Sequence, residues 1–205
     1  AGGLGAPVIQ YLAAAGVGTI GIVDDDVVDL SNLQRQVIHT TSRIGMAKVS
    51  SAREAASDIN PDVTIIEHKQ RLTASNARNL ISKYDIVSDG CDNFITRFLV
   101  MDSCYLERKT LVSGAILRFD GQISVFKPHE RTGDNCPCYR CLYPEAPPLN
   151  IIPTCAEAGV LGTLCGTIGS LQAAEVLKEI VGFGESLSGS LIIFDSLRTE
   201  FRKIK

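Results

Sequence analysis

The sequence lacks three features that would each indicate a class of protein. Lys and Arg number 20 against 23 Asp and Glu, a formal net charge of −3, whereas nucleic-acid-binding surfaces are usually strongly basic. No apolar run approaches the ~20 residues that a membrane-spanning helix needs, and no signal peptide is visible. We therefore expect a cytoplasmic protein with neither a nucleic-acid nor a membrane partner.

The sequence also lacks a disulfide framework. Its seven cysteines are an odd number, and most lie inside periodic segments rather than at the spacings of paired cysteines. Free, metal-bound or reactive thiols in a reducing compartment fit this usage. With 205 residues, of which 45% are hydrophobic, the chain is expected to form a single domain over residues 1–205.

A first strand is also missing. The chain opens with a glycine loop at residues 1–5 that no strand precedes, although a buried parallel sheet rarely lacks a central strand. Residues 201–205 stop within a strand-like pattern. We expect the first strand and the C-terminal end to lie outside this sequence.

Compact apolar segments alternate with helical segments along most of the chain. This is the pattern of an α/β fold with a Rossmann-like, doubly wound and mainly parallel sheet. The expected strands are 19–23, 63–66, 84–88 and 111–116, and the expected helices are 7–15, 45–59, 74–82, 94–106 and 159–181.

The pattern changes after residue 116. Asp120-Gly121 is a turn signal between apolar runs, which predicts antiparallel strands that extend the sheet. Segments 190–195 and 199–204 predict a terminal hairpin. Residues 127–154 form a loop too long for a simple connection, which we expect to be a zinc or crossover loop.

The glycine loop and Asp24 together indicate nucleotide binding. Glycines let the backbone approach a phosphate, and the helix after the loop offers free N–H groups. Asp24 ends the next strand about 20 residues on, where an acidic residue accepts ribose hydroxyls. A glycine turn alone would explain no more than tight strand–helix packing.

Arg35 and Lys48 indicate which reaction the bound nucleotide undergoes. Adenylyl transfer needs cations that stabilise charge on the α-phosphate and on leaving pyrophosphate. A forked Arg35 and a point charge on Lys48 suit that role. By residue type alone, both would be solvated surface cations.

The order of the motifs resembles the molybdopterin-synthase and thiamine-biosynthesis adenylyltransferases, bacterial relatives of ubiquitin-activating enzymes, over essentially the whole chain. The resemblance rests on Gly2-Gly3-Leu4-Gly5, Asp24, Ser31-Asn32-Leu33-Gln34-Arg35-Gln36, Lys48, Asp92-Asn93 and Cys138-Tyr139-Arg140-Cys141. It implies that Gly3 and Asp24 bind the nucleotide and that Asn32, Arg35 and Lys48 bind its phosphates, with Ser31, Leu33, Gln34 and Asn93 among the cofactor-binding residues and Mg²⁺ on Asp92.

Asp92 also has chemistry of its own. It follows an apolar strand and precedes a helix, so it is expected at the carboxyl edge of the sheet, where ligands bind in open α/β folds. The alternative is a helix N-cap, in which case Asn93 needs no function.

Cys138 and Cys141 have the spacing of half a tetrahedral zinc site. A redox pair is less expected, because the motif lies in a loop rather than at the head of a helix in a βαβ unit. In the resembled family the second pair lies beyond residue 205, and Cys136 as a substitute ligand would be unusual. Zinc here would be structural.

Cys155 matches the position of a thioester- or persulfide-forming cysteine in some family members. It would attack the acyl-adenylate as a nucleophile; the alternative is a small residue before a helix. Cys91, Cys104 and Cys165 are expected in the core.

The resemblance thus implies an ATP-dependent adenylyltransferase that activates the C-terminal carboxylate of a ubiquitin-like sulfur carrier ending in Gly-Gly, with a sulfur donor protein as second partner. A homodimer is expected, partly because the apolar helix near 160–181 exceeds what one small sheet covers. The alternatives are an NAD-dependent dehydrogenase, which leaves Arg35 and Lys48 unexplained, and a non-catalytic scaffold for a ubiquitin-like partner.

Overall fold

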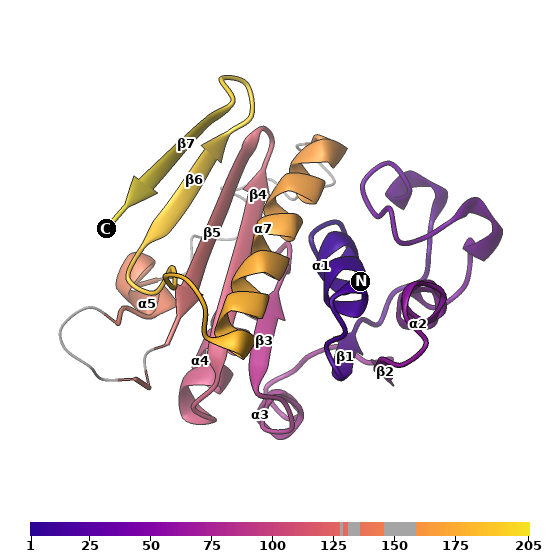
Figure 1. Cartoon of the computed structure of the whole chain (residues 1–205), viewed down its shortest axis with the longest axis horizontal. Coiled ribbons are helices and arrows are strands. Elements are labelled where there is room, and N and C mark those ends of the chain that lie inside the picture. Colours follow the sequence, from indigo (N-terminus) through magenta and orange to yellow (C-terminus); the bar gives the residue numbers. More distant parts are fainter. Residues whose placement is uncertain (128, 131–135, 146–158) are drawn as a thin grey trace.

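A computed structural model describes residues 1–127, 129–130, 136–145 and 159–205 of the chain. Its strands form two sheets, one with the order β1-β2 and one with the order β3-β4-β5-β6-β7 (Figure 1). The strands are β1 (Thr19–Val23), β2 (Thr64–His68), β3 (Ile86–Asp89), β4 (Thr110–Leu117), β5 (Asp120–Phe126), β6 (Leu191–Asp195) and β7 (Glu200–Ile204).

The parallel part of the fold agrees with the expectation. β1 pairs with β2, and β3 with β4, both in parallel. The expected single sheet is nevertheless divided, since no described strand pairs with the second edge of β1 or of β3. Both of these edges border the same cleft, which Ile20 and Ile22 line from one side and Ile86 and Ser88 from the other.

The antiparallel extension is confirmed, but its first turn is not where the sequence predicts it. β4 to β7 follow one another as antiparallel neighbours. Leu117 pairs with Asp120, so the turn falls at Arg118 and Phe119, and Arg118 adopts the positive φ of 54°. Asp120 and Gly121 lie inside β5, where a side chain on Gly121 would collide with Ile168. The glycine therefore serves close packing rather than a turn.

Helices cover both faces of the five-stranded sheet, because Val112 belongs to a buried cluster with Val176 and the neighbouring Leu111 belongs to another with Met101. In Figure 1, α7 lies across the five-stranded sheet and α1 lies beside it, toward β1. A Cβ on Gly169 of α7 would lie only 2.6 Å from the Leu4 carbonyl oxygen, so this glycine permits the close contact. The helices are α1 (Gly5–Ala14), α2 (Lys48–Ile59), α3 (Ala77–Ile81), α4 (Phe94–Leu106), α5 (Tyr139–Leu142) and α7 (Gly162–Val181).

The five expected helices agree with the pattern to within three residues at each end. Three of them begin three residues later than predicted: α2 at Lys48, α3 at Ala77 and α7 at Gly162. Before α2, Val27 and Ala47 form an isolated β-bridge instead, which holds the chain extended up to Lys48. No described helix is both long and apolar enough to cross a membrane.

Candidate functional site

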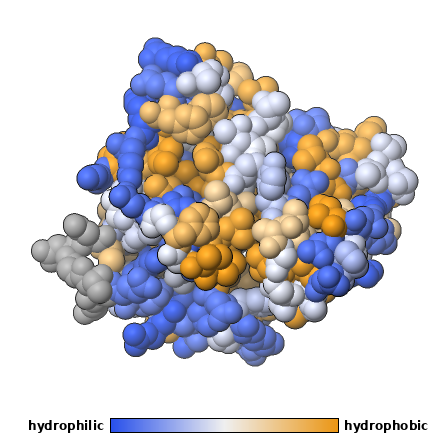
Figure 2. Space-filling model, viewed as in Figure 1, coloured by the Kyte–Doolittle hydropathy of each residue, from blue (hydrophilic) through white to orange (hydrophobic). Residues whose placement is uncertain are grey.

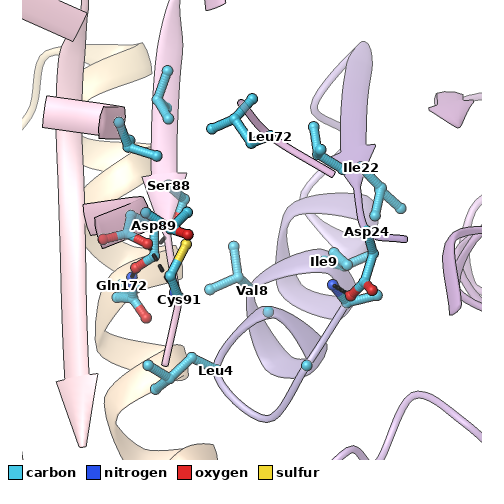
Figure 3. Close-up of a pocket in the computed structure, with 18 of the residues that line it drawn as sticks. Leu4, Val8, Ile9, Ile22, Asp24, Leu72, Ser88, Asp89, Cys91 and Gln172 are labelled. Carbon is cyan, nitrogen blue, oxygen red and sulfur yellow. Dashed lines mark hydrogen bonds and ion pairs between the residues drawn. The ribbon is translucent and has the colours of Figure 1, made fainter. Parts of the chain in front are cut away.

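A cleft of about 1760 Å³ runs along the glycine loop and between β1 and β3. In Figure 3, Asp24 lies at the end of β1 on one side, Asp89, Cys91 and Gln172 lie on the other, and Leu4 and Val8 lie between them. The cleft brings together these residues expected to bind a nucleotide or metal: Gly3, Asp24, Arg35, Lys48, Asp92 and Asn93. Ser31, Asn32, Leu33 and Gln34 do not line it.

One side of the glycine loop packs against α7, and the loop also lines the cleft. A Cβ on Gly3 would lie 2.8 Å from the Cys165 sulfur, and Cys165 is fully buried. The next helix, α1, has no side-chain cap at its N-terminus. Its first N–H groups and the positive end of its dipole therefore suit an anion at this end of the cleft.

Asp24 lies directly after β1, where its Oδ1 accepts from the Asp26 N–H at 3.0 Å. This contact fixes the carboxylate at the mouth of the cleft, beside the glycine loop, where a ribose hydroxyl could be bound.

Lys48 is the most deeply buried cation of the cleft, with 6% of its surface exposed. Its Nζ donates to Asp26 Oδ2 at 2.6 Å, and this hydrogen bond holds the pKa of Asp26 below its ordinary value. A lysine in the first turn of a helix opposes the helix dipole. The Asp26 carboxylate offsets that cost and keeps the ammonium group in place.

The residues from Ser31 to Gln34 support the site from outside the cleft. Asp29 and Asn32 form a capping box around a 3₁₀ helix, Leu30–Asn32, and Ser31 donates its hydroxyl proton to Asp29 at 2.6 Å. The Gln34 backbone packs directly on Gly162 at the start of α7. Contacts between residues 31–34 and a nucleotide therefore stay a prediction. In this geometry these residues position Arg35 and Gln36, the next two residues of the chain.

Arg35 and Gln36 are the two residues of this segment that reach the cleft. Arg35 donates from Nη1 to the Ser31 carbonyl at 3.1 Å, which leaves further guanidinium donors for a ligand. Gln36 has 4% of its surface exposed, and its Oε1 has no hydrogen-bond partner among the described residues. The sequence motifs do not single out Gln36 as a site residue, although it adjoins Arg35.

Asp92 is exposed on the loop between β3 and α4 and lines the cleft. The N-cap considered for it belongs to Asn93, which accepts from the Thr96 N–H at 2.9 Å. Among the described residues, the one hydrogen-bond partner of the Asp92 carboxylate is the Asn93 amide at 3.4 Å. Its oxygens remain accessible to a cation.

A buried ion pair that the sequence motifs do not indicate supports this loop. Arg97 donates to Asp89 at 3.3 Å, to the Gly114 carbonyl at 2.8 Å and to the Cys91 carbonyl. Asp89 also accepts from the Cys91 N–H at 2.8 Å. The pair thus fixes the backbone just before Asp92. A carboxylate that ends a buried strand, with an arginine eight residues on, is the signal that could have indicated it.

The Cys138 and Cys141 sulfurs lie 3.5 Å apart at α5. Arg140 anchors this short helix to α4 through a bidentate pair with Asp102, at 2.8 and 2.6 Å. No third His, Cys, Asp or Glu within the described ranges completes a metal site.

Two of the three cysteines expected in the core are there, whereas Cys91 is half-buried and lines the cleft. Cys104 and Cys165 are fully buried, and burial raises the pKa of Cys104 to about 12. Burial also raises the pKa of Cys91. The Cys91 and Cys104 thiols are therefore protonated and unreactive near neutral pH. Cys155 lies outside the described residues.

A glycine loop that opens a helix, an acidic residue after the next strand, and two cations on the same cleft define a nucleotide-binding α/β domain. The chain belongs to the ThiF family, whose model matches residues 1–205.

Curated relatives agree with this assignment. The chain is 49% identical to the sulfur carrier protein adenylyltransferase of Thermus thermophilus, 52% identical to the probable adenylyltransferase/sulfurtransferase MoeZ of Mycobacterium tuberculosis and 50% identical to the adenylyltransferase and sulfurtransferase MOCS3 of Sus scrofa. All of the chain aligns, and it spans 75%, 52% and 44% of their respective lengths.

The fold also matches solved structures. One of Escherichia coli MccB with a MccA variant superposes with a TM-score of 0.83 at 20% identity, over all of this chain and 62% of that one. The selenomethionine structure of PaaA superposes with a TM-score of 0.78 at 16% identity, over all of this chain and 61% of that one. At these identities the likeness concerns the fold alone.

Proposed function

We propose that the protein is an ATP-dependent adenylyltransferase that activates the C-terminal carboxylate of a ubiquitin-like sulfur-carrier protein. The observation that carries the proposal is the meeting of Arg35 and Lys48 with the glycine loop and Asp24 on one cleft. The names of the relatives support the same reaction and the carrier as substrate.

The reaction needs positioning and positive charge rather than a proton-transfer group. A carrier carboxylate is already ionised near neutral pH, so its oxygen attacks the α-phosphorus directly while the bond to pyrophosphate breaks. Asp24 holds the ribose, and Arg35 and Lys48 stabilise the charge on the departing pyrophosphate. The product is an acyl-adenylate, which a sulfur donor protein then converts to a thiocarboxylate.

Asp92 is the residue proposed to hold Mg²⁺. Carboxylate oxygens are ligands that Mg²⁺ accepts together with substrate phosphates and water, and the accessible oxygens of Asp92 on the cleft fit this donor set. The ion would neutralise charge on the phosphates when bound. The buried Asp89–Arg97 pair keeps the Asp92 backbone in place.

Cys138 and Cys141 are proposed to bind structural Zn²⁺ together with two further ligands. Their separation of 3.5 Å is close to what two thiolates about 2.3 Å from one tetrahedral zinc would show. Cys155 is proposed to be dispensable for adenylation, because carboxylate attack requires no thiol. Cys155→Ala should therefore still form acyl-adenylate.

A homodimer in the cytoplasm is proposed for the intact protein. The apolar face of α7 is mostly covered within the chain by β4 and α1, so the sequence-based reason for dimerisation is weakened. Exposed apolar residues remain at its C-terminal end, at Ile180, Val181 and Phe183, and Figure 2 shows apolar residues gathered across the middle of one face. Sedimentation of a monomer at micromolar concentration would contradict the dimer.

A nucleotide-binding panel separates the proposal from its rivals. We expect ATP to bind more tightly with Mg²⁺ than without it, and NAD to bind weakly or not at all. Preference for NAD would indicate the dehydrogenase, and no binding of either nucleotide would indicate the scaffold. Asp92→Asn serves as the matched variant: it should lose the Mg²⁺ effect while it keeps the fold.

A further inference from the structure

His39 is a buried histidine that the proposed reaction does not use. Its side chain lies between two groups far apart in sequence, with Nε2 at 2.9 Å from the Ala1 carbonyl oxygen and Nδ1 at 2.8 Å from the Ser51 hydroxyl. Only 5% of His39 is exposed, and Ser51 is fully buried. This contact joins the first residue of the glycine loop to the first half of α2.

The two partners define the tautomer. A backbone carbonyl oxygen can only accept, so Nε2 carries the proton and donates it to Ala1. Nδ1 then accepts from the Ser51 hydroxyl. Burial lowers the pKa of His39, which keeps the ring in this neutral form near pH 7.

His39 also connects three parts of the cleft. Its backbone N–H donates to the Gln36 carbonyl at 3.0 Å, which ties it to the segment that carries Arg35. Ser51 lies about one helical turn after Lys48 on α2. The glycine loop, the segment with Arg35 and the helix with Lys48 are thus held in register around one imidazole ring.

The glycine loop needs such an anchor. Gly2 and Gly3 have more backbone freedom than other residues, and a loop that must place its N–H groups against a phosphate loses affinity if it moves. The hydrogen bond from His39 Nε2 to the Ala1 carbonyl oxygen supplies this anchor at the start of the loop.

We propose that His39 is a positioning residue for nucleotide binding, which holds the Ala1 carbonyl through Nε2–H and so fixes the glycine loop relative to Lys48. The inference rests on the proposed function, because it names the ligand of that loop as ATP. It assigns His39 no contact with substrate.

Two substitutions separate the two hydrogen bonds. His39→Gln keeps an N–H donor near the Nε2 position, and His39→Asn keeps only a group near the Nδ1 position. Loss of the Ala1 hydrogen bond is expected to raise the Kd for MgATP about tenfold in His39→Asn. His39→Gln should stay within about threefold of the wild type, by the same scale.

Asn60→Ala is the matched control. Asn60 donates from Nδ2 to the Ala13 carbonyl at 3.1 Å, so it ties the opposite end of α1 to α2, away from the glycine loop. Asn60→Ala should lower the unfolding temperature and leave the Kd for MgATP unchanged. An unchanged Kd in His39→Asn, with stability lowered as in Asn60→Ala, would overturn the inference and leave His39 a structural residue.

Hydrogen exchange without nucleotide makes the test independent of the proposed function. Backbone exchange over residues 1–6 should be faster in His39→Asn than in the wild type or in His39→Gln. If the wild type fails to bind MgATP, the proposed function fails and the nucleotide role of His39 with it. If the wild type binds MgATP and exchange over residues 1–6 is unchanged in His39→Asn, the inference alone fails.

Discussion

At the scale of single residues, Lys48 is a cation that folding places in the cleft at a cost. It is buried, it stands in the first turn of α2, and its charge is balanced by Asp26. A lysine with no role beyond solubility would point to solvent. Burial beside the glycine loop therefore favours a role in binding an anion.

Arg35→Ala and Lys48→Met should each leave the fold intact and slow adenylation sharply. Loss of one preorganised cation is expected to cost about 2.7–4 kcal/mol in the transition state, or roughly 100- to 1000-fold in rate. Carrier-dependent exchange of pyrophosphate into ATP measures it. Arg53→Ala removes an exposed cation of α2 that pairs with Glu67 outside the cleft, and it should exchange at the wild-type rate.

The Lys48–Asp26 pair also predicts how stability depends on pH. The hydrogen bond from Lys48 lowers the pKa of Asp26, so the stabilisation is present above the unfolded value of about 3.9 and is lost as pH falls through the lower folded value. The difference in unfolding free energy between the wild type and Asp26→Asn should therefore shrink in acid. An Asp26→Asn difference that is independent of pH would contradict the pairing.

At the scale of elements, the sequence pattern predicts the parallel strands and most helices because buried strands and amphipathic helices have clear periodicities. It predicts the residues that line the cleft less well. The Ser31 to Gln34 segment carries the recognisable motif, yet it forms a capped 3₁₀ helix and contacts α7. Asp89 and Arg97 support the site but carry only a weak local signal, because their pairing depends on how β3 and α4 pack.

Gly3→Ala should disturb the glycine loop through its contact with α7. The added Cβ would lie 2.8 Å from the buried Cys165 sulfur, and such overpacking typically costs about 1–3 kcal/mol. The free energy of unfolding, measured in urea, and the affinity for MgATP should both fall. A second change, Cys165→Ala, should restore part of each loss. Gly5→Ala has open space around its Cβ and should gain about 1 kcal/mol of helix stability. Equal effects of the two single changes would contradict this packing.

We expect the stability of the protein to depend on zinc bound by Cys138 and Cys141 at α5. Cys138→Ser or Cys141→Ser should lower both the zinc content and the free energy of unfolding of the full-length protein, because a closed zinc site contributes folding free energy. Elemental analysis together with urea unfolding measures both. Cys136→Ser, in which the Glu130 carbonyl loses its thiol contact, should retain zinc. Full zinc content in Cys138→Ser would show that this pair is not a ligand pair.

At the scale of the whole molecule, two sheets with separate strand pairing share one core. Leu12 of α1 and Ile22 of β1 belong to the same buried cluster as Val112 of β4, Ile123 of β5 and Val176 of α7. The cleft runs along the boundary between the sheets, and the residues proposed to bind the nucleotide and Mg²⁺ come from both sides: Asp24 and Lys48 from one, Asp92 from the other. The site therefore depends on the complete arrangement rather than on one motif.

We propose that the residues of this cleft catalyse transfer of the adenylyl group of ATP to a carboxylate. The most direct test of this proposal is exchange of labelled pyrophosphate into ATP by the full-length protein, with Mg²⁺, in the presence of a ubiquitin-like carrier that ends in Gly-Gly. We expect exchange that requires the carrier and disappears when the terminal glycine of the carrier is removed. Tight binding of MgATP and carrier without any exchange would contradict the proposal.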